Sequence, residues 1–357
     1  MQTRTLVVWI TFLAVFTMAA RMSVDTDTWW HFLAGEWMVE NRQILQVGVL
    51  SHTRYGEPWR YPGWLVEIPM YWIYRLAGPG GLNLWTAAMV TLAFAFIWRV
   101  QSGSSYLRAF ITVLAAAASG VYWAARPYLV TFVLVAVFLY LLEHWRWHPG
   151  PKHERWLWLL PVLMVLWANS HGGFFAGFLL LAVYLAGEGW GWLNAVVRQR
   201  STPNQHLDLR QQHALRLRRL IWISLLTLLG ACLTPVGPRL LLYPIQTVEI
   251  AALQAYIQEW QAPDFHNLSM QPFLWLLLAL YVIVRRVLRW ALGRVSAMYT
   301  LPILNAPVRL GAAQIAGLER IPAVVRETIK RIGYINAEYG FDYQTCLSMV
   351  VMTPQVW

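Results

Sequence analysis

The stretch PYLVTFVLVAVFLYLLE, residues 127–143, decides the fold class of this chain. Apart from Thr131 and Glu143 its residues are apolar or aromatic. A helix that crosses a bilayer core takes roughly 17 to 25 such residues. Because lipid offers no hydrogen-bond partners, a run of this kind satisfies its backbone only as a helix or within a closed barrel. The stretch therefore predicts a membrane-spanning helix.

Similar apolar runs recur along the chain and suggest further spans. They lie at 4–20, 82–99, 107–123, 156–169, 173–191, 219–235 and 271–288. The composition agrees, since 58% of the 357 residues are hydrophobic and only 13% are charged, far from the averages of soluble domains. We expect an all-α, polytopic transmembrane helix bundle of about eight spans.

Two of the apolar segments admit a second interpretation. Residues 4–20 also resemble a cleaved signal peptide, but we favour a retained span because the segment suits the opening helix of a bundle. The run at 64–77 is shorter and contains Glu67, Pro69 and Arg75. It therefore predicts an interfacial helix on the outer membrane surface, within the first outer loop.

Basic residues are enriched in the cytoplasmic loops of membrane proteins, which gives the expected orientation. With the N-terminus inside, the loops at 99–108, 143–155, 198–219 and 285–294 are cytoplasmic, and all four are basic. Counting 64–77 as a full span would place these loops outside, so the rule favours the interfacial assignment. We expect an integral plasma-membrane (inner-membrane) protein with a cytoplasmic N-terminus.

The net charge of +11 is spread over these loops and forms no domain of its own. This distribution indicates membrane topology, with membrane lipid as a partner and no nucleic acid. The two cysteines, Cys232 and Cys346, lie far apart in the sequence. Neither a disulfide framework nor a thiolate metal site is indicated.

Polar residues that would be costly in lipid fall on the opposite, outer side of this topology. They stand at the ends of predicted spans, where a shared aqueous cavity would hold them. The residues are Asp25, Asp27, His31, Arg126, Asn169, His171, Arg239 and Glu259. Their convergence predicts a functional site on the extracytoplasmic face.

These residues also have structural interpretations. One of Asp25 and Asp27 fits a helix cap at the start of the amphipathic stretch TWWHFLAGEWMVEN. Asn169 and His171 fit a turn between two helices. Arg126 fits a side chain that extends to the membrane interface.

A metal site is a further alternative. Asp25, Asp27 and His31 have the ligand types that a divalent cation takes. No second histidine lies four residues after His31, so the spacing of common metal motifs is missing. The cofactor is therefore left open between none and a divalent cation.

The stretch at 25–78, which runs from DTDTWWH to YRLAG, resembles the first outer loop of bacterial GT-C glycosyltransferases, the polytopic class that uses lipid-linked sugars. ARPYLVTFVL (125–134), LWANSHGGFFAGFLLL (166–181) and LTPVGPRLLLYP (233–244) resemble later segments of an uncharacterised bacterial branch of that class. The resemblance covers about residues 1–290.

The resemblance implies transfer of a hexosyl or pentosyl group from a polyprenyl-phosphate donor to an acceptor on the outer face. An acid at the position of Asp25 or Asp27 would act as base on the acceptor hydroxyl, or would position the donor through a metal. Arg126, together with Arg239, would stabilise the departing phosphate. The residues expected to orient the reactants are His31, Asn169, His171 and Glu259.

The chain changes character near its C-terminal end. Family members usually continue with more spans, so 1–291 suggests a truncated GT-C-like domain, followed by a linker at 292–320. VRETIKRIGY and GFDYQTC, within 321–346, resemble S-adenosylmethionine synthetase, in which the position of Asp342 lies in the substrate site. The rest of the sequence shows no ATP-site counterpart, so we expect 321–357 to be a fragment without activity.

Two functions of different classes stay open. A transporter or non-catalytic lipid-binding protein would carry polar groups or broken helices near mid-membrane, in repeated halves. Here the polar groups stand at the outer ends of the spans and the sequence shows no internal repeat, which favours the glycosyltransferase. A third interpretation takes the C-terminal stretch at face value as a synthetase, and the missing ATP site argues against it.

Overall fold

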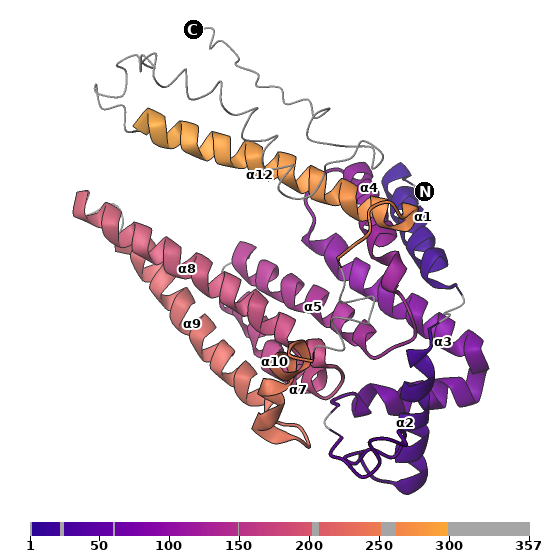
Figure 1. Ribbon diagram of the computed structural model, residues 1–357. Helices are drawn as coiled ribbons and strands as arrows, with labels where there is room; N and C mark the ends of the chain where they lie inside the picture. Colours follow the sequence, from indigo (N-terminus) through magenta and orange to yellow (C-terminus); the bar gives the residue numbers. More distant parts are fainter. Residues whose placement is uncertain are drawn as a thin grey trace, which may run out of the picture. The chain divides into compact units, whose positions relative to one another are not determined.

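The structure is a computed structural model that describes residues 2–21, 25–59, 61–148, 150–201, 207–250 and 262–298 (Figure 1). It is all-helical, as predicted, and the described residues contain no strand. The chain divides into two compact units, Met1–Tyr281 and Val282–Trp357. Most of the predicted linker at 292–320 and the whole of 321–357 lie outside the described residues.

Nine helices of ten residues or more are found among the described residues. They are α1 (Thr3–Ala19), α2 (Asp27–Asn41), α3 (Trp64–Val100), α4 (Ser105–Ser119), α5 (Tyr128–Trp147), α7 (Leu159–Ala168), α8 (Phe175–Ser201), α9 (Leu207–Ala231) and α12 (Gln271–Met298). Short helices and 3₁₀ turns connect them: η1 (Gly120–Tyr122), α6 (Pro151–Glu154), η2 (Arg155–Trp158), η3 (Gly172–Phe174), η4 (Gly237–Leu242), α10 (Tyr243–Val248) and η6 (Leu268–Met270).

Five of the described helical segments are long and apolar enough to cross a membrane, against about eight expected from the sequence. They are Trp64–Val100, Ser105–Tyr122, Tyr128–Trp147, Gly172–Val197 and Leu268–Arg286. Helix α1 is apolar but has 17 residues.

The remaining two predicted spans differ from long apolar helices for local reasons. The run at 156–169 begins as the 3₁₀ turn η2, so α7 keeps only ten residues, about 15 Å of helix. The run at 219–235 belongs to α9, whose first half is the basic segment LDLRQQHALRLRR.

The expected interfacial helix at 64–77 and the span after it form one helical element, α3, with a break between them. The break is at Gly78, whose φ of 60° and ψ of −156° lie outside helical values and suit only glycine. Pro79 follows and has no N–H to continue the hydrogen-bond ladder. The predicted boundary between the two segments is therefore a kink.

Helix α5 lies at the centre of the first unit, packed against α3, α7 and α8. Large side chains such as Phe138, Trp145 and Trp167 are fully buried there. Helices α8 and α9 lie side by side, and α2 packs on α3 (Figure 1). This packing brings the start of α2, the start of α3, the segment just before α5 and the α7–α8 turn to one region.

Candidate functional site

Arg126 joins the predicted acidic pair. Its guanidinium donates from Nη2 to Oδ2 of Asp27 at 2.6 Å and from Nη1 to Oδ2 of Asp25 at 3.3 Å. The two partners stand 99 and 101 positions earlier in the chain. The guanidinium carbon also lies 5.3 Å from the ring centroid of Tyr128, in the first turn of α5. The fold thus brings together three residues that the sequence analysis selected.

The two aspartates have different surroundings. Asp25 stands just before α2, and its Oδ1 accepts the N–H of Asp27 at 2.8 Å, while its Oδ2 accepts from Arg126. The N-cap of α2 is Thr26, so Asp25 stands one residue before the cap, and its bond to the N–H of Asp27 forms an Asx turn that leads into the helix. The side chain of Asp27 is 43% exposed, against 21% for Asp25, and no described residue bonds its Oδ1. Asp27 is therefore the carboxylate that a ligand can reach.

His31 lies one turn after Asp27 on α2 and faces the first turn of α3. Its Nδ1 lies 2.8 Å from Oε1 of Glu67, and both side chains are almost wholly buried. Burial, with the nearby Arg126 and His171, lowers the pKa of His31 to about 2, so the imidazole is neutral. Glu67 was missed as a site residue; the available signal was a single acid inside the apolar run WLVEIPMYW.

His171 lies in the turn between α7 and α8. Its Nδ1 accepts the N–H of Gly173 at 3.0 Å and lies 3.0 Å from Oγ1 of Thr131 on α5. Thr131 Oγ1 in turn accepts from Nε1 of Trp167 at 2.8 Å. Burial and the charge of Arg126 lower the pKa of His171 to about 4. The imidazole is therefore neutral at pH 7.

Asn169 has a different environment from the one expected of an orienting residue. Its Oδ1 accepts from Nε1 of Trp64 at 2.9 Å, and its Nδ2 donates to the carbonyls of Val165 and Leu233 at 2.8 and 2.9 Å. The amide thus ties the start of α3 to the end of α7 and to the segment after α9. These contacts hold elements together and use most of the amide's hydrogen-bonding capacity.

Arg239 does not join this group. Arg239 is exposed on η4, and none of the contacts among the described residues connects it to Arg126 or the aspartates. Glu259 lies outside the described residues.

Two tyrosines near the group were also missed. Burial raises the pKa of Tyr61 well above its ordinary value, with Glu67 nearby. Burial raises the pKa of Tyr243 as well. The Tyr243 ring lies against Gly172, where an added Cβ would come within 2.3 Å of Cε1. Nothing in the local sequence of either tyrosine predicts this placement, because each depends on the packing of distant segments.

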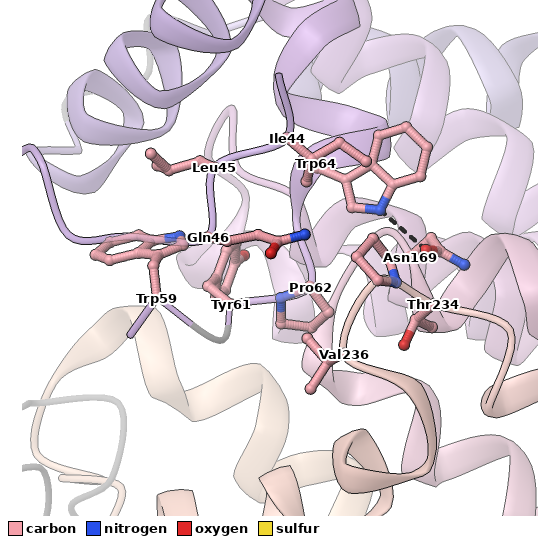
Figure 2. Close-up of a pocket in the computed structure, with 11 residues that line it drawn as sticks. Ile44, Leu45, Gln46, Trp59, Tyr61, Pro62, Trp64, Asn169, Thr234 and Val236 are labelled. Atoms are coloured by element: carbon pink, nitrogen blue, oxygen red, sulfur yellow. Dashed lines mark hydrogen bonds between the residues drawn. The ribbon is translucent and has the colours of Figure 1, made fainter. Parts of the chain in front are cut away.

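A small pocket opens beside the group (Figure 2). Trp59, Tyr61 and Trp64 give it aromatic walls, and Asn169 and Thr234 give it polar atoms. Oγ1 of Thr234 is buried without a hydrogen bond to any described residue. The enclosed space is about 20 Å³, which holds about one water molecule. A larger ligand enters this pocket only if lining side chains move.

The described residues do not form the metal site suggested by the sequence. No three His, Cys, Asp or Glu side chains converge on a possible ion position within the described part of the chain. Asp25 and Asp27 are bound by Arg126, whereas His31 turns its Nδ1 to Glu67. The two aspartates therefore share Arg126 as a partner, while His31 has Glu67.

Comparisons with curated proteins show a short similarity. The S-adenosylmethionine synthases of Nitratidesulfovibrio vulgaris strains DP4 and Hildenborough are each 46% identical to this chain over 50 residues, which are 14% of this chain and 13% of the synthase. No protein family and no solved structure matches the chain. The GT-C resemblance of residues 1–290 stays a prediction.

Proposed function

We propose that the chain is a membrane glycosyltransferase, which moves a sugar from a polyprenyl-phosphate donor to an acceptor hydroxyl on the extracytoplasmic face. The observation that carries this proposal is the convergence of Asp25, Asp27 and Arg126 at helix ends, from parts of the chain about a hundred residues apart. An accessible carboxylate beside a guanidinium supplies the two groups that such a transfer requires, a proton acceptor and a partner for the leaving phosphate.

In the proposed reaction Asp27 is the base. As the acceptor oxygen bonds to the anomeric carbon, its proton passes to the free oxygen of Asp27. The bond between that carbon and the phosphate oxygen breaks, and the phosphate leaves with the electron pair. The guanidinium of Arg126 stabilises the negative charge that develops on the leaving oxygen. Asp25 holds the start of α2 and keeps Arg126 in place.

Sugar transfer from radiolabelled polyprenyl-phosphate donors, measured in membranes that contain this chain, tests the proposal. We expect Asp27→Asn to lower the rate by about 100-fold or more, which is the usual contribution of a general base. Asp208→Asn is the matched control, because Asp208 is an exposed acid on α9 with no proposed role. A folded wild-type chain without transfer overturns the proposal and favours the transporter or lipid-binding alternative.

A further inference from the structure

The hydrogen-bond partners of His171 determine where its ring proton sits. The N–H of Gly173 can only donate, and it points to Nδ1 at 3.0 Å. Thr131 Oγ1 already accepts the indole N–H of Trp167, which also can only donate. The Thr131 hydroxyl proton is thus available to donate to Nδ1 of His171, 3.0 Å away. Nδ1 is an acceptor in both contacts, so the proton of the neutral ring is on Nε2.

The groups around His171 keep this ring neutral. Arg126 and His31 are near enough to interact electrostatically, and the ring of Tyr128 has its centroid 6.4 Å away. Tyr243 lies against the neighbouring Gly172. The three acids of this region that the structure describes have other partners, since Asp25 and Asp27 bind Arg126 and Glu67 bonds His31. A second positive charge on His171 is therefore unfavourable.

Nε2 of His171 is a donor that no described residue accepts. The ring of Tyr128 lies near both His171 and Arg126, and Arg126 acts electrostatically on His171, so the two donors belong to the same region. A guanidinium and a neutral imidazole N–H together are suited to an oxyanion with at least two oxygens.

We propose that His171 is a neutral hydrogen-bond donor to an oxyanion ligand, and that this ligand is the phosphate of the lipid-linked donor. The assignment of the ligand rests on the proposed function. The tautomer does not, because it follows from Gly173, Thr131 and Trp167 alone. His171 is therefore a ligand-binding residue that does not act as the base.

The tautomer is tested without any activity. In the ¹⁵N spectrum of histidine-labelled protein in detergent, the His171 signals are assigned by their loss in His171→Gln. We expect a protonated Nε2, an unprotonated Nδ1 and no titration between about pH 5 and pH 8. A protonated Nδ1, or a titration midpoint within that range, overturns the proposal.

Ligand binding is tested with two variants that separate the ring nitrogens. In His171→Asn the side-chain oxygen can accept the Gly173 N–H in place of Nδ1, but no donor remains at the Nε2 position. In His171→Gln an amide N–H remains near the Nε2 position, and the Nδ1 acceptor is lost. We expect Asn to weaken the binding of a short polyprenyl phosphate about tenfold or more, and Gln to weaken it much less. Equal affinity of the two folded variants overturns the proposal.

Inorganic phosphate serves as the second probe. If it shows the same difference between Asn and Gln, the site recognises phosphate by itself; if only the polyprenyl phosphate shows it, the lipid chain contributes to binding. Both results support His171 as the donor. A chain that has the expected tautomer and binding difference but transfers no sugar refutes the proposed function alone.

Discussion

Asp25 and Asp27 stand two residues apart, and we predict that their removal has different effects on stability. Asp25→Ala removes the acceptor of the Asp27 N–H as well as one contact of Arg126. Losing a hydrogen bond of this kind costs about 0.5–1.5 kcal/mol. Asp27→Ala removes a side chain that is 43% exposed, so its cost should be smaller. Thermal unfolding in detergent measures both, and the reverse order would refute the division of roles.

We predict an acid-dependent loss of stability from His171. The pKa of this residue is about 4 in the folded protein and about 6.5 in an unfolded chain. Below pH 6.5 the unfolded chain binds a proton that the folded protein does not, so stability falls as the pH falls. The loss is up to about 1.4 kcal/mol per pH unit, and it ends near pH 4.

Unfolding of wild type and of His171→Gln, measured between about pH 7 and pH 4.5, checks this slope. The variant has no imidazole at this position, so its stability should change less with pH. Equal slopes for the two proteins would show that the folded His171 titrates normally.

At the scale of single residues, the sequence predicted which polar residues form the site better than it predicted which groups they bind. Asp25, Asp27 and Arg126 could be selected because charges at the ends of apolar runs are costly without a shared site. Glu67 was missed although it is a single acid inside an apolar run, since its bond to His31 depends on α2 lying against the first turn of α3. Asn169 also looked like a ligand-facing residue, whereas its amide bonds protein groups.

At the scale of elements, the contact between α2 and α3 depends on Gly35. A Cβ added there would lie 2.2 Å from the carbonyl oxygen of Glu67, so the two helices approach too closely for any side chain. We predict that Gly35→Ala pushes the helices apart and costs roughly 1–3 kcal/mol. The same shift would strain the bond between His31 and Glu67.

Gly187→Ala on α8 is the matched control, because nothing lies within 4 Å of the added Cβ. Alanine has the better helix propensity, so this variant should be neutral or more stable by roughly 0.5–1 kcal/mol. Thermal unfolding compares the two variants. Equal effects would mean that the α2–α3 contact does not need a glycine.

The sequence predicted where the helices lie more reliably than which of them are long. Apolar runs predicted a helix at each of the eight positions, because burial and lipid both demand apolar side chains. The run at 156–169 could not be recognised as short, since a 3₁₀ start replaces part of the expected helix. The kink at Gly78 was signalled by the GPGG sequence, although we expected a boundary there and not a bend.

For the whole molecule, the basic loops and the polar site are predicted to lie on opposite sides of the membrane. The loop at 42–62 precedes the site elements of α3, while the loop at 101–104 follows the same helix. Since Trp64–Val100 is long and apolar enough to cross, the two loops should face different compartments. Taken together, the basic loops at 99–108, 143–155, 198–219 and 285–294 give the orientation under the positive-inside rule, which places 101–104 in the cytoplasm and 42–62 outside.

Single cysteines in these loops measure the orientation directly. Thr53 and Ser102 are exposed, so Thr53→Cys and Ser102→Cys are placed in a chain whose Cys232 and Cys346 are replaced by serine. We expect a membrane-impermeant maleimide to label the cysteine at 53 in intact cells and the cysteine at 102 only after lysis. The reverse pattern would put the Arg126 group on the cytoplasmic side. Labelling of both in intact cells would mean that α3 does not cross the membrane.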